Sequence, residues 1–112
     1  MDENKLFLQL REFAIEFPDG VIMGFGHLQP IKKGWVVKVK DQTDFEGETG
    51  LLTAIKIASS TTRTIAGWQD EDVELWDVVM IFDTEEEATK AGMENEQMAI
   101  YQIQTGRLKW LK

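Results

Sequence analysis

The chain of 112 residues contains no cysteine and a single histidine, His27. Without cysteine the protein cannot form disulfide bonds, bind a metal through thiolates or use a cysteine nucleophile. A metal site with two histidines cannot form within one chain, and a Ser–His–Asp arrangement would depend on His27 alone. The sequence therefore predicts no catalytic residue, no metal site and no cofactor, and stability must come from packing.

Long apolar runs are also absent. No window approaches the roughly 20 apolar residues that span a bilayer, and the first residues lack the basic and apolar regions of a secretory signal. No glycine-rich loop has the spacing that binds phosphates, so nucleotide binding is not expected. We expect a cytoplasmic protein with no membrane association.

Apolar and aromatic residues are plentiful, at 43% and 10% of the chain, with four tryptophans and six phenylalanines. This is too much large apolar surface for a disordered chain. A chain of this length typically hides roughly two-thirds of its surface on folding. We expect residues 1–112 to form a single domain with one core.

Charge is distributed unevenly along the chain, whose net charge is −8. Residues 41–96 carry fifteen acidic and three basic side chains, whereas residues 97–112 carry three basic and no acidic ones. An acidic surface repels phosphate backbones, so direct nucleic-acid binding is not expected. The acidic middle section favours a basic partner instead.

Three helices are predicted from apolar periodicity and capping residues. Residues 3–17 and 50–59 both place apolar side chains at helical spacing. A third helix should begin after Thr84, because Thr84-Glu85-Glu86-Glu87 matches a capping box, and it should end at Gly92.

Six strands are predicted, over residues 21–26, 35–40, 62–69, 74–82, 98–104 and 107–111. We expect the first two to pair as a hairpin, and the last two to form another around Thr105-Gly106. Residues 75–82 are apolar on both faces apart from Asp77, which is typical of a central strand covered on both sides.

The resulting order, helix–strand–strand, occurs three times. In each unit an isoleucine of the first strand precedes a tryptophan of the second, in the pairs Ile22 and Trp35, Ile65 and Trp76, and Ile100 and Trp110. This pattern indicates either a structural repeat or a coincidence among many short elements. We predict an α+β fold in two layers, with a mainly antiparallel sheet and helices chiefly on one face.

Residues 70–74 form the densest acidic cluster, which contains Asp70, Glu71, Asp72 and Glu74. A calcium-binding loop would need glycine at its sixth position, where this chain has Leu75. A solvated turn between two strands explains the cluster better.

Tryptophan is enriched at protein interfaces, so each of the four tryptophans could be a contact residue. Trp35 and Trp76 lie on apolar strand faces and are predicted to be in the core. Trp68 precedes the acidic turn and Trp110 is next to the chain end, so these two are candidate partner-binding residues.

Lysine side chains alternate with valines over residues 36–40. Lys32, Lys33, Lys38 and Lys40 could form a basic patch with Arg107, Lys109 and Lys112. The other interpretation, an edge strand that its lysines protect from aggregation, is preferred.

Three functions of different class follow from these patterns. The leading hypothesis is a non-catalytic acidic module that binds a basic protein, as an inhibitor, an immunity protein or a decoy does, through Trp68, Asp70, Glu71, Asp72, Glu74 and Trp110. The second is a small carboxylate-dependent hydrolase, since twenty acids offer many pairs. The third is a homo-oligomeric structural protein whose strand edges pair between copies.

Overall fold

The computed structural model describes residues 3–26 and 29–112. Its elements, in chain order, are α1 (Glu3–Glu16), β1 (Val21–Gly24), β2 (Trp35–Lys38), β3 (Phe45–Glu46), α2 (Gly47–Ser59), β4 (Thr64–Asp70), β5 (Val73–Phe82), α3 (Glu85–Glu94), β6 (Ala99–Gln102) and β7 (Leu108–Trp110). The predicted order of helices and strands is confirmed, with the short strand β3 added.

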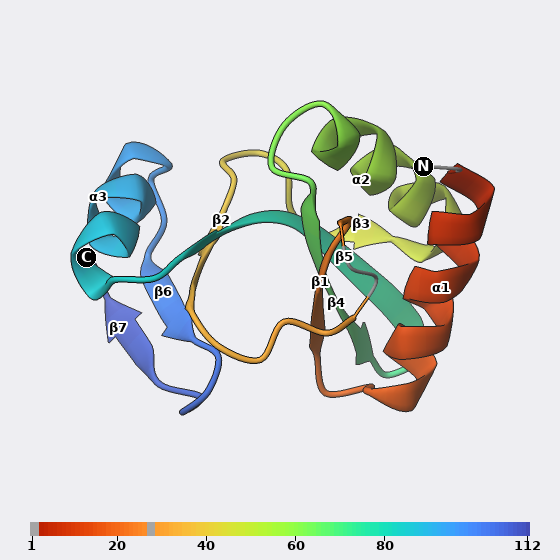
Figure 1. The fold of residues 1–112 in the computed structure, drawn as a ribbon, viewed down its shortest axis with the longest axis horizontal. Helices are drawn as coiled ribbons and strands as arrows, with labels where there is room; N and C mark the ends of the chain where they lie inside the picture. The colour runs from red at the N-terminus through yellow and green to blue at the C-terminus, as the bar shows by residue number, and fades with distance from the viewer. Residues whose placement is uncertain (1–2, 27–28) are drawn as a thin grey trace.

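All seven strands belong to one antiparallel sheet with the order β1-β4-β5-β2-β6-β7, in which β3 also pairs with β5. The predicted α+β class is therefore confirmed. β4 and β5 form one hairpin, and β6 and β7 form the other that was predicted. Figure 1 shows the two ends of the sheet, with α1 and α2 beside one and α3 beside the other.

The predicted pairing of residues 21–26 with 35–40 is wrong. β1 pairs with β4, whereas β2 lies between β5 and β6. After β1 the chain first folds back, because the Ile31 N–H donates to the Ile22 carbonyl at 2.7 Å and closes the free edge of β1. It then crosses to the other half of the sheet, a step that no local turn signal encodes.

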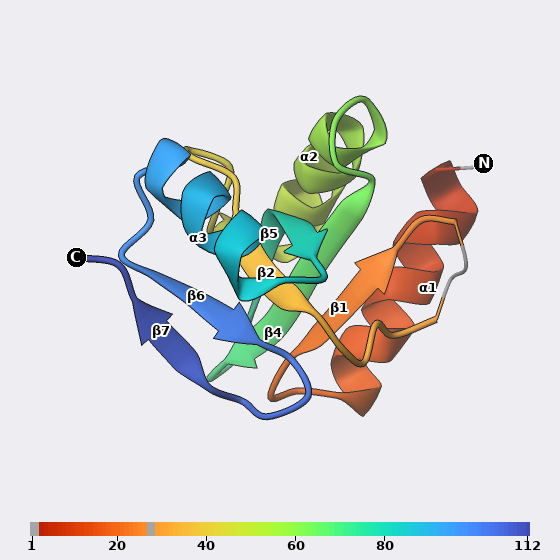
Figure 2. The same cartoon turned by 60° about the vertical axis from the view of Figure 1, so that its left-hand side comes forward.

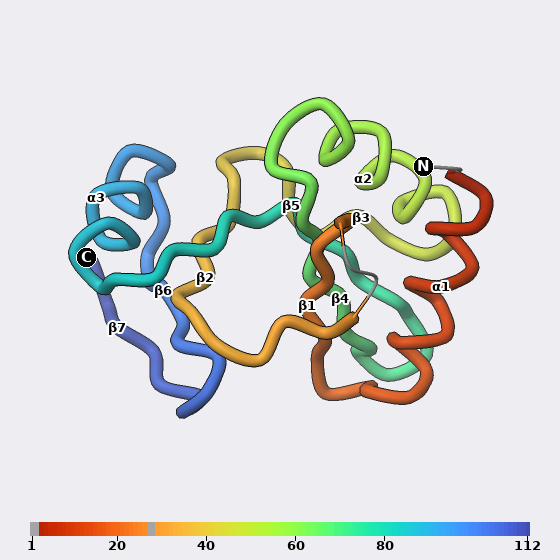
Figure 3. The backbone as a smooth tube through the Cα atoms, in the orientation of Figure 1, coloured from red at the N-terminus to blue at the C-terminus, as the bar shows by residue number. Residues whose placement is uncertain are grey.

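Two apolar cores lie side by side under the helices. The larger one packs α1 and α2 against β1, β4 and the first half of β5, and the smaller one packs α3 against β2 and β6. β5 contributes Trp76 and Val78 to the first core and Met80 and Phe82 to the second. Because alternate residues of a strand share a face, both cores lie on the same side of the sheet, and Figure 3 traces β5 from one half to the other.

The helix ends differ in part from their predicted positions. Thr84 caps α3 as predicted, since its side chain accepts a hydrogen bond from the Glu87 N–H. Gly92 does not end α3, which continues to Glu94, and an added Cβ there would lie 2.5 Å from Leu111 Cδ1. This glycine is needed for close packing.

No helix within residues 3–26 or 29–112 is long and apolar enough to cross a membrane.

The three isoleucine–tryptophan pairs do not occupy equivalent places. Ile65 and Ile100 are buried in the two cores, whereas Ile22 lies on the opposite face of the sheet. Trp110 is 64% exposed, while Trp35 and Trp76 are buried. The positions therefore give no support to a structural repeat.

Candidate functional site

One face of the sheet carries no helix among the described residues, as Figure 2 shows. We call it the open face, and it forms a groove with a volume of about 1020 Å³. Most of its lining is apolar or aromatic: Phe17, Val21, Ile22, Pro30, Ile31, Val36, Ala66, Trp68, Val79, Met98, Ala99, Tyr101, Ile103 and Leu108. Apolar clefts of this size, with a few polar groups, are typical of ligand-binding sites.

Asp77 lies at the floor of this groove, in the middle of β5, and its side chain is fully buried. Trp76 and Val78 face the core, so the alternation of the strand directs Asp77 to the open face. Its Oδ1 accepts a hydrogen bond of 2.7 Å from the Asp44 N–H, and Lys38 Nζ lies 3.2 Å from its Oδ2. Burial raises the pKa of the Asp77 carboxyl, and these two contacts lower it again only in part.

Lys38 is the last residue of β2 and reaches Asp77 from the neighbouring strand. Its Nζ also lies 5.3 Å from the centroid of the Trp68 ring, which is within the range of a cation–π contact. β2 is a central strand, so the preferred interpretation of its lysines as edge protection is wrong. Lys38 instead neutralises a buried carboxylate.

The predicted partner-binding residues divide between the two faces. Trp68 is half-buried on the open face, and Asp70, two residues later on β4, has the same orientation. Glu71 and Asp72 form the exposed turn between β4 and β5, which confirms the predicted turn. Of these four residues only Trp68 lines the groove, and the three acids follow it along the β4–β5 hairpin.

Glu74 points to the helix-covered side and does not belong to this group. Its Oε2 lies 3.6 Å from Arg11 Nε, while Arg11 Nη1 contacts Glu48 Oε1 at 2.7 Å. A second hollow of about 600 Å³ surrounds this pair, and Glu71 and Asp72 also line it. The arginine partly neutralises the acids there.

Trp110 lies on the open face too, because it pairs with Ala99 across β6 and β7. The strands β5, β2 and β6 separate β7 from β4, so Trp110 is at the opposite end of the sheet from Trp68. The structure therefore places the two predicted tryptophans on one face without bringing them together.

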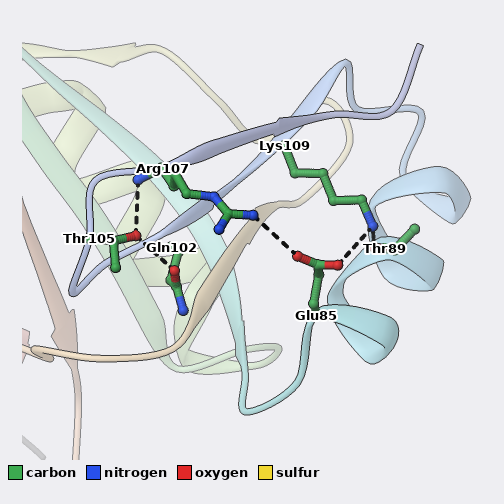
Figure 4. Close-up of polar contacts among 6 residues, drawn as sticks. All are labelled: Glu85, Thr89, Gln102, Thr105, Arg107 and Lys109. Atoms are coloured by element: carbon green, nitrogen blue, oxygen red, sulfur yellow. Dashed lines mark hydrogen bonds and ion pairs between the residues drawn. The ribbon is translucent and has the colours of Figure 1, made fainter.

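The basic residues at the C-terminus contact acids of the middle section rather than forming a patch. Figure 4 shows Glu85 between Lys109 and Arg107. Glu85 Oε2 lies 3.3 Å from Lys109 Nζ, and Glu85 Oε1 lies 3.8 Å from Arg107 Nη2. Lys40 pairs with Glu96 in the same way. Opposite charges far apart in sequence are thus brought together by folding.

Sequence reasoning missed Asp77 and Lys38 as a site. The available signal was the single charged residue inside the apolar run of β5, since a buried carboxylate in a central strand needs a partner. Asp77 and Glu96 are both paired with lysines, and the described residues contain no cluster of acids or histidines that could hold a metal. His27, the histidine on which a Ser–His–Asp arrangement would depend, lies outside the described residues.

The chain matches no protein-family model, and comparison with curated proteins and with solved structures gives no significant similarity. Its function must therefore be inferred from the side chains of the open face.

Proposed function

We propose that the protein is a non-catalytic binding module that receives a basic segment of a partner protein on its open face. The observation that carries this proposal is the groove of about 1020 Å³, where Tyr101 and Leu108 are exposed and Trp68 is half-buried on a face without helices. Monomeric proteins rarely leave a large contiguous apolar patch exposed unless it binds something.

The charges near Trp68 define the chemistry of the partner. Asp19 and Lys32 line the groove, and three further acids, Asp70, Glu71 and Asp72, follow Trp68 on the β4–β5 hairpin. The whole chain carries a net charge of −8. A segment with apolar residues for the groove and arginine or lysine residues for its acidic end is complementary in both respects, and charge complementarity speeds and orients association. We expect this partner in the cytoplasm.

The hydrolase hypothesis receives less support from the groove. Two carboxylates that act as acid and base must both exchange protons with a substrate. Of the three carboxylates that line the groove, Asp77 and Glu96 are ion-paired with Lys38 and Lys40, which leaves Asp19.

Selection from a displayed library of random peptides tests the proposal. We expect the enriched peptides to combine basic with apolar residues and to bind more weakly as salt is raised. Binding should be lost in Trp68→Ala and weakened by the triple reversal Asp70→Lys, Glu71→Lys and Asp72→Lys. Glu74 is left unchanged because it pairs with Arg11.

Two exposed residues of the helix-covered side provide matched controls. Glu94→Lys reverses one charge on α3, and Leu52→Ser removes an exposed apolar side chain of α2. Neither change should alter peptide binding. Enrichment of acidic peptides, or binding that survives the Trp68 and hairpin variants, would contradict the proposal.

A further inference from the structure

The open face already holds one cation in a defined position. The Lys38 ammonium lies between the buried carboxylate of Asp77, at 3.2 Å, and the ring of Trp68, at 5.3 Å from its centroid. A carboxylate and an aromatic ring that both contact one cation form a recognition site that stabilises positive charge by ion pairing and by cation–π attraction. We call these two groups the Asp77–Trp68 site.

We propose that the Asp77–Trp68 site binds a guanidinium group, the arginine side chain of the partner segment, and that Lys38 occupies this site only while the partner is absent. This inference rests on the proposed function, and it names the group that the partner must present. Lys38 then acts as an internal competitor that a suitable partner displaces.

The surrounding charges favour a cation over an anion as the ligand. An anion could pair with Lys38 from the solvent side, and Lys32 also lines the groove. Asp19 lines the same groove, however, and Asp70 follows Trp68 on the same face of β4, so two carboxylates would repel an anion beside Trp68. The Lys38 charge is also largely neutralised by Asp77, whereas these two acids have no ion pair among the described residues.

The geometry favours a guanidinium over an ammonium. Asp77 Oδ2 has Lys38 Nζ nearby but receives no well-directed hydrogen bond from any described residue. A planar guanidinium can stack on the Trp68 ring while its N–H groups point to a carboxylate, which a tetrahedral ammonium on a flexible stem does less well. An arginine would therefore complete a contact that Lys38 leaves incomplete.

Lys38 is able to leave without exposing an uncompensated charge. Its side chain is 48% exposed, and its backbone is held by the pairing of β2 with β5, so only the side chain has to turn toward water. The incoming guanidinium replaces one positive charge by another, so Asp77 remains paired throughout. This exchange avoids the large penalty of a buried unpaired carboxylate.

Chemical rescue of a Lys38→Ala variant tests the inference on the full chain. The substitution removes the internal cation, and butylguanidinium is the probe that should take its place beside Asp77. We expect the probe to raise the melting temperature of Lys38→Ala and to bind it at least about tenfold more tightly than the wild type, where the tethered lysine competes. Butylurea, which is neutral and of similar shape, should have no effect.

The double variant Lys38→Ala/Asp77→Asn is the matched control, since it removes the carboxylate as well. It should show no rescue. Equal effects of butylguanidinium on both variants, or none on Lys38→Ala, would overturn the inference. If Lys38→Ala does not fold, the wild type and Trp68→Leu are titrated with butylguanidinium instead, and the amide chemical shifts around Asp77 are recorded. Shifts that saturate only in the wild type support the site, and their absence refutes it.

These results are separable from the test of the proposed function. Peptides that bind the open face without needing arginine, together with a failed rescue, would remove the Asp77–Trp68 site and leave the binding module in place. Rescue by butylguanidinium without any selected peptide would establish the cation site and refute protein binding.

Discussion

The two faces of the sheet differ in what their side chains have to do. The helix-covered face buries Trp76, Val78 and Val37 in continuous apolar cores, where each residue stabilises the fold. The open face buries a carboxylate, Asp77, and keeps Trp68 only half-covered beside Lys38. Burying a charge opposes folding, whereas burying an apolar side chain favours it. The buried carboxylate of the open face is therefore not explained by selection for stability alone.

The largest expected difference in stability is between two tryptophans on adjacent strands, Trp76 and Trp68. Trp76→Ala should lower the free energy of unfolding by about 3–5 kcal/mol, because it leaves a cavity in a packed core. Trp68→Ala should lower it by less, roughly 1–3 kcal/mol, because the Trp68 ring is only partly buried and leaves no enclosed cavity when it is removed. Urea denaturation of the two variants measures both values. Equal losses would show that Trp68 is a core residue.

The next largest effect on the free energy of unfolding is expected for the Lys38–Asp77 pair. Lys38→Ala should destabilise the fold by about 1–2 kcal/mol, less than the removal of a partner from a fully buried pair, because Lys38 is half-exposed. Adding Asp77→Asn should recover most of this loss, since it removes the unpaired charge while Asn can still accept from the Asp44 N–H. A double-mutant cycle by urea denaturation checks this, and additive losses would contradict it.

The pH dependence of stability tests the environment of Asp77. Burial raises its pKa in the folded state, so the folded protein binds this proton more tightly than the unfolded chain does. The free energy of unfolding of wild type relative to Asp77→Asn should therefore fall as pH rises from the ordinary value of 3.8 through the raised pKa, and then level off. A relative stability that increases over this range would show that the Lys38 contact outweighs burial.

Trp110 on the last strand should have the smallest effect. Trp110 is 64% exposed, so Trp110→Ser should change the free energy of unfolding by no more than about 0.5 kcal/mol.

The solution mass of the wild type and of Trp110→Ser, from light scattering, also tests the homo-oligomer hypothesis. A mass above that of one chain in the wild type, lost in Trp110→Ser, would assign the exposed edge of β7 to self-association rather than to an open monomeric face.

The sequence predicted the elements of the fold because the signals for them are local. Apolar periodicity located α1, Thr84 marked the start of α3, and Gly106 marked the turn between β6 and β7. Strand pairing between distant segments has no comparable local signal. The pairing of β1 with β4 was missed for that reason, and with it the central place of β2.

The same reason explains which parts of the site were predicted. Trp68 and the acidic turn were recognised because they are neighbours in the sequence. Lys38 and Asp77 are far apart in the chain and meet only because β2 and β5 pair, with Lys38 opposite Val79. Their contact depends on the register of two strands, which neither composition nor spacing specifies.

The central claim is that the open face, rather than the helix-covered face, binds the partner. The most direct measurement is a map of backbone amide chemical shifts in the full chain as an arginine-containing peptide from the selection is added. We expect the shifts to concentrate at Ile22, Trp68 and Tyr101 and to leave the exposed helix residues Leu8 and Leu52 unchanged. Shifts centred on α1 and α2, with the open face unaffected, would contradict the claim.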